Sequence, residues 1–263
     1  MSRVSLQITA AVPSSLYLEY GFLLVVRILA ILMTGPLFSQ RNIPVQAKIV
    51  LAFSLTVLLF PAWKGRLTPL PRSLFPFLLL VMREVLVGAL LGFTAMLSFV
   101  GLQMVGQIIG SQMGFSLAGM MNPLSGTQST PLDQFYTVLA VLIYLGLNGH
   151  HDLILAIATT LELLPLGSFA GQTLMLERLV MLTGTIFAAA VQIALPVMGT
   201  LILTDATLAL ISRAVPQLNA FIFGLPLKVG LGLAGLALTL PITAPLVTRL
   251  LAAAAQNMTA LVR

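Results

Sequence analysis

The side chains with the greatest capacity for metal or acid–base chemistry in this sequence are consecutive: His150, His151 and Asp152. A catalytic zinc ion takes about three protein ligands, commonly with further hydrogen-bonded support. The chain contains 2 histidines in all, and adjacent side chains on a helix are expected to point well apart. Because Asn148-Gly149 marks a turn and an acidic residue favours a first helical turn, we predict a polar helix start here.

Other motifs that carry chemistry are missing from the sequence. There is no phosphate-cradling G-x-x-x-x-G-K, no nucleophile elbow and no H-E-x-x-H pattern. The absence of cysteine excludes disulfides and thiolate chemistry. We therefore predict that the protein is not an enzyme and that it has no catalytic residue, cofactor or metal.

A second group of reactive side chains consists of charges inside or beside apolar segments. A charge at bilayer depth costs about 2.5–3.5 kcal/mol, so each should pair or face a polar cavity. One interpretation is an ion or proton relay; the other is structural ion pairing. Both signs are scattered over separate segments, which favours structural pairing, and we expect the partners to come from neighbouring subunits. The predicted assembly charges are Arg27, Arg83, Glu84, Glu162, Asp205 and Lys228.

Composition shows what kind of surroundings these charges have. Of 263 residues, 59% are hydrophobic and 8% are charged, whereas soluble domains average about 25% charged. The chain must therefore be surrounded mainly by lipid or by partner subunits. The net charge of +6 is spread thinly, without the Lys/Arg runs that track phosphates, so we predict no binding to nucleic acid. The first fifteen residues lack an apolar core with a cleavage site, so no removable signal peptide is expected.

Apolar blocks separated by short turns predict an all-α integral membrane protein, since a backbone in lipid must satisfy its own hydrogen bonds. Proline and glycine inside the blocks predict broken helices and helical hairpins. Pro196 interrupts one block, and Pro241 with Pro245 indicates a hairpin or a broken helix in the last. Residues 1–263 form a single membrane unit whose orientation the scattered loop charges leave open. The predicted blocks are Tyr17–Phe38, Val45–Trp63, Leu74–Leu102, Leu132–Asn148, His151–Leu166, Leu179–Thr204 and Ala220–Ala255.

The stretch Val85–Leu132 contains no Asp, Glu, Lys, Arg or His. It opens with a G-x-x-x-G pair, Gly88 and Gly92. Small residues at this spacing let another helix approach closely. Later in the stretch a small residue recurs at every fourth position, beside a neutral polar stripe of glutamine and serine. These later small residues are Gly106, Gly110, Gly114 and Ala118, and the stripe is Gln103, Gln107 and Ser111.

Methionine and phenylalanine lie among the glycines at the end of this stretch. Methionine adapts to irregular or changing surfaces, and glycine permits unusual backbone conformations. One interpretation is a deformable, uncharged plug that fits around passing chains; the other is a helix-packing seam that ends in a turn at Asn122-Pro123. The candidate plug or constriction residues are Gly106, Gly110, Met113, Gly114, Phe115, Met120 and Met121.

Several strings, in this order, resemble the FliR family of the type III protein-export gate over nearly the whole chain. The first loop is Pro36-Leu37-Phe38-Ser39-Gln40-Arg41-Asn42-Ile43-Pro44, and Glu84 with Gly88, Gly92 and Phe93 follows. The most specific string is Gln112-Met113-Gly114-Phe115-Ser116, within Gly106–Pro123. Asn148-Gly149-His150-His151, Pro165-Leu166-Gly167 and Pro216-Gln217-Leu218-Asn219 with Gly224, Pro226 and Lys228 complete the series.

The resemblance implies a non-enzymatic core subunit of the flagellar export gate in the bacterial inner membrane and flagellar basal body. Its N-terminal part would be like FliP and its C-terminal part like FliQ. FliP and FliQ homologues would form the channel with it, and FlhB, rod-base components, unfolded rod, hook and filament subunits and membrane lipid would contact the assembly. The segment matching Gly106–Met121 would be the plug.

Three alternatives stay open from the sequence. The double histidine favours a flagellar gate over the gate of a virulence type III secretion system. A secondary transporter for a small solute would use the proline-broken helices as a midplane site, but only Gln192 lies near such a break. A purely structural scaffold, with Gly106–Met121 as a packing seam, is the remaining interpretation.

Overall fold

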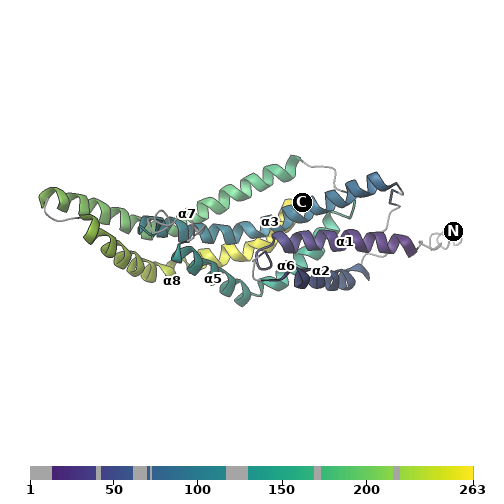
Figure 1. The fold of residues 1–263 in the computed structure, drawn as a ribbon, viewed down its shortest axis with the longest axis horizontal. Coiled ribbons are helices and arrows are strands. Elements are labelled where there is room, and N and C mark those ends of the chain that lie inside the picture. Colours follow the sequence, from purple (N-terminus) through teal and green to yellow (C-terminus); the bar gives the residue numbers. More distant parts are fainter. Residues whose placement is uncertain are drawn as a thin grey trace. The chain divides into compact units, whose positions relative to one another are not determined.

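A computed structural model of the protein describes residues 14–39, 43–61, 70–71, 73–116, 130–168, 173–215 and 220–262. Every regular element in these ranges is helical, which confirms the prediction of an all-α fold (Figure 1). The helices are α1 (Ser14–Thr34), α2 (Val45–Leu59), α3 (Leu74–Gln112), α5 (Pro131–Gly146), α6 (Gly149–Leu163), α7 (Thr173–Ala214) and α8 (Ala220–Val262).

Four of the described helices are long and apolar enough to cross a membrane: α1, α3, α7 and α8. A fifth span results if α5 and α6 together make one bent span. This length is the expected consequence of the composition, because each residue of a helix advances 1.5 Å and the hydrocarbon layer is about 30 Å thick. The prediction of a membrane protein is confirmed.

The chain divides into two compact units. The first contains Met1–Met96, Ile154–Leu176 and Asn257–Arg263, and the second contains Leu97–Leu153 and Glu177–Gln256. Helix α3 therefore contributes its N-terminal part to the first unit and its C-terminal part to the second. Each unit has its own buried contacts.

In the first unit, α1 and α2 form an antiparallel hairpin, with the Tyr17 and Phe60 rings 6.2 Å apart at its open end. Helix α3 runs parallel to α1. Its Gly88 lies directly on α1, where a Cβ atom would stand 2.5 Å from the carbonyl oxygen of Arg27. Gly92 makes the same approach one turn later, beside the Ile31 carbonyl. The predicted G-x-x-x-G pair is therefore the seam between α1 and α3.

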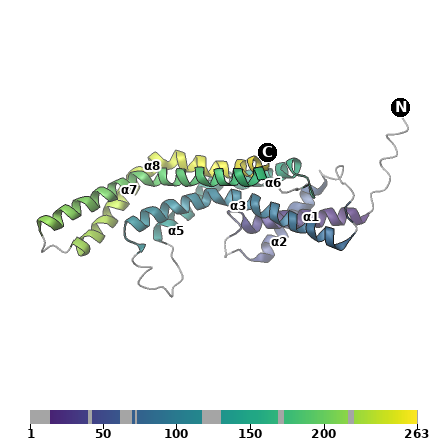
Figure 2. The same cartoon turned by 90° about the horizontal axis from the view of Figure 1, so that it is seen from above.

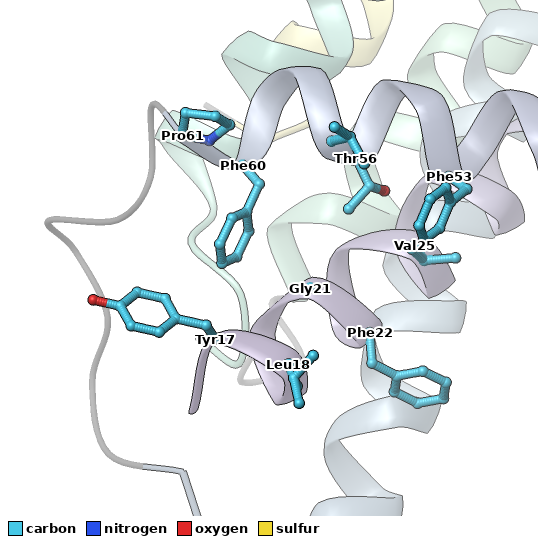
Figure 3. Close-up of a pocket in the computed structure, with 10 residues that line it drawn as sticks. Tyr17, Leu18, Gly21, Phe22, Val25, Phe53, Thr56, Phe60 and Pro61 are labelled. Carbon is cyan, nitrogen blue, oxygen red and sulfur yellow. The ribbon is translucent and has the colours of Figure 1, made fainter. Parts of the chain in front are cut away.

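An open groove of about 610 Å³ lies between α1 and α2 (Figure 3). Its lining is almost entirely apolar, and the Phe22 and Phe53 side chains stand at its rim with half or more of their surface exposed. Thr56 adds little polarity, because its hydroxyl already donates to the carbonyl of Ala52 at 2.8 Å. The groove thus offers apolar contact without directional hydrogen bonds.

In the second unit, α7 and α8 run antiparallel and side by side (Figures 1 and 2). A Cβ atom on Gly224 would lie 3.1 Å from Leu208, and one on Gly235 would lie 3.8 Å from Val197. The C-terminal part of α3 contributes Gly101, whose Cβ would meet the Ile186 side chain at 2.6 Å. These close approaches form the core of the unit.

The chain bends by 73° between α5 and α6. Asn148 adopts a left-handed backbone with φ of 56°, and a Cβ on Gly149 would collide with the Tyr144 ring. The carbonyl of Asn148 accepts the amide of His151 at 2.9 Å, so the predicted helix start at Asn148-Gly149 is confirmed. The expectation that the two histidine side chains point well apart is wrong, because their ring centroids lie 4.3 Å apart.

The prolines do not break the two longest helices. Helix α7 continues through Pro196, and α8 continues through Pro226, Pro241 and Pro245. The predicted hairpin or break at Pro241 and Pro245 is therefore wrong. A proline removes one backbone donor and crowds the preceding turn; Pro241 and Pro245 are both exposed, and α8 remains helical on either side of them. Helix α3 likewise runs ten residues past the predicted end at Leu102, to Gln112.

Candidate functional site

A buried ion pair joins α1 to α3 in the first unit. Arg27 and Glu84 are both 0% exposed, and the Arg27 Nε atom lies 2.5 Å from the Glu84 Oε2 atom. Arg27 Nη1 also donates to the carbonyl of Leu164 at 2.6 Å, and Glu84 Oε1 accepts the backbone amide of Gly167 at 2.8 Å. The pair thus binds both α1 and α3 to the turn that follows α6.

This network explains how two charges are accommodated among apolar helices. A buried pair is tolerated when its remaining donors and acceptors are also satisfied. Arg27 places positive charge at the C-terminal end of α6, where the helix dipole favours a cation. The expectation that the partner of Arg27 comes from another subunit is wrong, since Glu84 of the same chain neutralises it. One donor of this pair, Arg27 Nη2, is buried and has no hydrogen-bond partner among the described residues.

Replacing Gly167 with alanine is expected to reduce the free energy of unfolding by about 1–2 kcal/mol, because its φ of +81° is left-handed. An added Cβ would meet only Leu80, at an ordinary 3.6 Å, and the amide that donates to Glu84 would remain. The loss would therefore report backbone strain alone. Denaturant unfolding of the purified chain in mixed micelles measures it, and an unchanged midpoint would contradict the assignment.

The other predicted assembly charges of the first unit lie differently. The side chains of Arg83 and Glu162 are exposed, and within the described residues neither belongs to an ion pair shorter than 4.0 Å. Adjacent residues in a helix face different directions, so Arg83 points outward while Glu84 points inward. The role of Arg83 and Glu162 in contacts with other subunits remains a prediction.

In the second unit, the C-terminal part of α3 packs against the start of α5. A Cβ on Gly106 would lie 2.5 Å from the Cα atom of Asp133, and one on Gly110 would lie 2.6 Å from Thr130 Oγ1. These two glycines, which the sequence placed in a plug, form a packing seam in this chain. The spacing of four that predicted close approach is confirmed, and the neighbouring helix is α5.

Asp133 is a buried charge that the sequence analysis missed. It is 0% exposed, and its Oδ1 accepts the Gln134 amide at 2.9 Å and the Thr130 hydroxyl at 3.3 Å. Thr130 in turn accepts the Asp133 amide, so the two residues cap the start of α5. The pattern Thr130-Pro131-Leu132-Asp133 was a readable signal, because Ser/Thr followed three residues later by an acid marks a helix start.

The end of α3 is held by a methionine and terminated by a glycine. Met113 is 0% exposed and fills a notch in α8 at Gly232, where a Cβ would lie 2.5 Å from the methionine Cε atom. Gly114 then turns left-handed with φ of 91°, and the Phe115 amide donates back to the Gly110 carbonyl at 3.0 Å. This is the geometry of a glycine-terminated helix.

A polar cluster adjoins that helix end. Asp205 of α7 forms an ion pair with Lys228 of α8, and their side chains are 40% and 22% exposed. The Gln112 Nε2 atom of α3 lies 3.3 Å from Asp205 Oδ2. The structure therefore brings two of the predicted assembly charges together, next to the predicted plug. Two other candidate plug residues, Met120 and Met121, lie outside the described residues.

These arrangements position neighbouring helices. Among the residues that the structure describes, no three His, Cys, Asp or Glu side chains gather to hold a metal ion. Two internal ion pairs, Arg27–Glu84 and Asp205–Lys228, and the cap at Asp133 instead link neighbouring helices or begin one. The fold and its buried charges thus define a polytopic α-helical membrane protein whose polar groups position neighbouring helices.

Comparison with known proteins identifies the family. Residues 18–254 match the bacterial export proteins, family 1, and the chain belongs to this family. It is 33% identical over 232 residues to the flagellar biosynthetic protein FliR of Escherichia coli K12, covering 87% of each chain. It is 36% identical over 216 residues to FliR of Bacillus subtilis 168, covering 80% of this chain and 82% of the relative.

A third FliR, from Aquifex aeolicus, is 34% identical over 219 residues and covers 82% of this chain and 83% of its own length. The predicted membership in the FliR family is therefore confirmed. With its apolar spans, the chain is a membrane component of a bacterial flagellar export apparatus.

Proposed function

We propose that this protein is a core subunit of the flagellar type III export gate in the bacterial inner membrane, at the flagellar basal body. In this proposal it forms with FliP and FliQ homologues the channel through which unfolded rod, hook and filament subunits leave the cytoplasm. FlhB and rod-base components contact the assembly. The N-terminal part plays the role of a FliP subunit and the C-terminal part that of a FliQ subunit.

The exposed faces of α7 and α8 support a place among other helices. Large apolar side chains point outward along both, including Leu203, Leu210 and Leu238, each at least 69% exposed. Such faces need lipid or partner helices to cover them. Asp205 and Lys228 interrupt this surface with a partly exposed ion pair, which fits an environment that is not uniformly lipid.

The single observation that carries the sealing role is the arrangement at the end of α3. Phe115 and Thr130 both lie against Gly110, so the described residues on either side of positions 117–129 meet at one place. That stretch contains no ionisable side chain and includes Met120 and Met121. An uncharged, methionine-containing stretch can fit varied passing chains without an electrostatic preference. We assign the sealing role to residues 114–121 and a positioning role to Gly106 and Gly110.

Deleting residues 114–120 from the full gate complex is expected to leave the complex assembled but to increase the ion flux through it at least tenfold. The reason is that the deletion removes the seal while leaving intact the contacts of Gly106 with Asp133 and of Gly110 with Thr130. Native mass spectrometry of the complex co-expressed with its FliP and FliQ homologues checks assembly. Ion efflux from proteoliposomes that contain the purified complex measures the leak.

The matched control is Gly184→Ala in the same complex, because no described atom of the chain itself lies within 4 Å of the new Cβ. The complex with this control variant should assemble and should show no increase in ion flux. A deletion complex that assembles and remains as tight as this control would refute the seal and favour a structural scaffold. The solute-transporter alternative loses its main support, because the described α7 and α8 are continuous through their prolines.

A further inference from the structure

The C-terminal end of α3 is fixed at two adjacent residues of the second unit. Met113 occupies the notch at Gly232 of α8, and Gln112 contacts the Asp205–Lys228 pair that joins α7 to α8. Immediately afterwards the helix ends at Gly114. Whatever follows Gly114 therefore starts from a point whose position α7 and α8 determine.

The two contacts differ in how easily they separate. The Met113 contact is fully buried, with the methionine Cγ and Sδ atoms also within 2.8 and 2.9 Å of a Cβ at Gly232. The polar contact is partly exposed, since Asp205 is 40% accessible. A partly exposed ion pair contributes less to stability than a fully buried apolar contact. A polar contact of this kind is suited to opening and closing while the fold persists.

We propose that Gln112, Asp205 and Lys228 form a latch that positions the root of the sealing stretch, with Met113 in the Gly232 notch as its pivot. The proposal rests on the sealing role assigned above and adds the element that controls it. In the closed state the Gln112 amide donates to Asp205, whose charge Lys228 neutralises. Release of Gln112 frees Gly114, Phe115 and Ser116 to move, so a movement of α7 against α8 that breaks this contact favours the open gate.

Gln112→Glu tests the polar contact, because the sign of the charge that it faces at position 205 can be reversed. Beside the native Asp205, Gln112→Glu places two like charges in contact and should open the latch. In the exchanged background Asp205→Lys with Lys228→Asp, the same glutamate faces a cation and should close it. Glutamine has both a donor and an acceptor, so Gln112 itself should hold the latch in either background.

The measurement uses the absence of native cysteine in the chain. Ser116 is exposed just beyond the latch. Ser116→Cys therefore introduces a single thiol into this chain, which a maleimide probe can label in the assembled complex. The same complex without Ser116→Cys measures the background labelling of the other subunits. Gln112→Glu should label about tenfold faster in the native background, the change expected for losing one hydrogen bond to a charged group. In the exchanged background the labelling rate should return to within about twofold of Gln112. Equal acceleration in both backgrounds, or in neither, would overturn the latch.

A second pair of variants tests the pivot by volume. Gly232→Ala should displace Met113 and accelerate labelling of Ser116→Cys, and adding Met113→Ala should restore space for the new methyl group. Gly230→Ala is the control on the same helix, because nothing lies within 4 Å of its Cβ. An effect of Gly230→Ala equal to that of Gly232→Ala would overturn the pivot.

The latch and the sealing role can fail separately. If the complex with the 114–120 deletion leaks ions but no latch variant changes the labelling rate of Ser116→Cys, the latch is wrong and the sealing role is supported. If labelling follows the latch variants while the deletion complex stays tight, the latch is supported and the sealing role is overturned.

Discussion

Replacing Glu84 with leucine is expected to lower the free energy of unfolding of the isolated chain by about 3–5 kcal/mol. The substitution leaves the Arg27 guanidinium in a site where it is 0% exposed, without its counter-charge. It also leaves the Gly167 amide without its acceptor. Because α1, α3 and the turn after α6 meet at this point, the loss should spread through the first unit.

The measurement is denaturant unfolding of the purified chain in mixed micelles, together with the amount of protein in membranes. The double variant Arg27→Met with Glu84→Leu removes both charges at similar volume, and such replacements are often far less costly than single ones. It should therefore recover a large part of the lost stability. Arg83→Gln, next in sequence but exposed, is the matched control and should change stability by at most about 0.5 kcal/mol. A double variant as unstable as Glu84→Leu would contradict the ion-pair explanation.

Gly106→Ala is the second substitution with a large expected effect, a loss of about 1–3 kcal/mol or more. The new methyl group would lie 2.5 Å from the Asp133 Cα and 2.6 Å from the Asp133 nitrogen and the Leu132 carbonyl oxygen. All of these are backbone atoms that cannot rotate away. The start of α5 must move, and the Thr130–Asp133 cap moves with it.

Gly184→Ala provides the comparison of opposite sign. No atom of the isolated chain lies within 4 Å of its Cβ, so the higher helix propensity of alanine should stabilise α7 by up to about 1 kcal/mol. The same unfolding assay should therefore move the two glycine variants in opposite directions. In the assembled complex, Gly106→Ala should also increase ion leak, because it displaces the return point of the sealing stretch. Equal stability of the two variants would refute the close packing of α3 on α5.

Sequence reasoning determined the class of protein and most of its elements. Eight per cent charged residues cannot cover a soluble fold of this length, and a backbone in lipid must be helical. Local chemistry was also sufficient for the turn at Asn148 and Gly149. The Asn-Gly pair marks a turn whatever packs around it, because both residues tolerate a left-handed backbone. The regular spacing of Gly88, Gly92, Gly106 and Gly110 correctly indicated close helix packing.

Only the tertiary structure decided which partners these residues meet. Arg27 and Glu84 are 57 positions apart in sequence and Gln112 and Asp205 are 93 apart, and no local pattern encodes such pairings. The same fold leaves no room for a Cβ atom at Gly106 and leaves open space at Gly184, although both are glycines in apolar helices. It also shows that α8 continues through Pro241 and Pro245, where the local pattern predicted a break. Periodicity specifies which face of a helix can pack, whereas the three-dimensional course of the chain specifies what packs there.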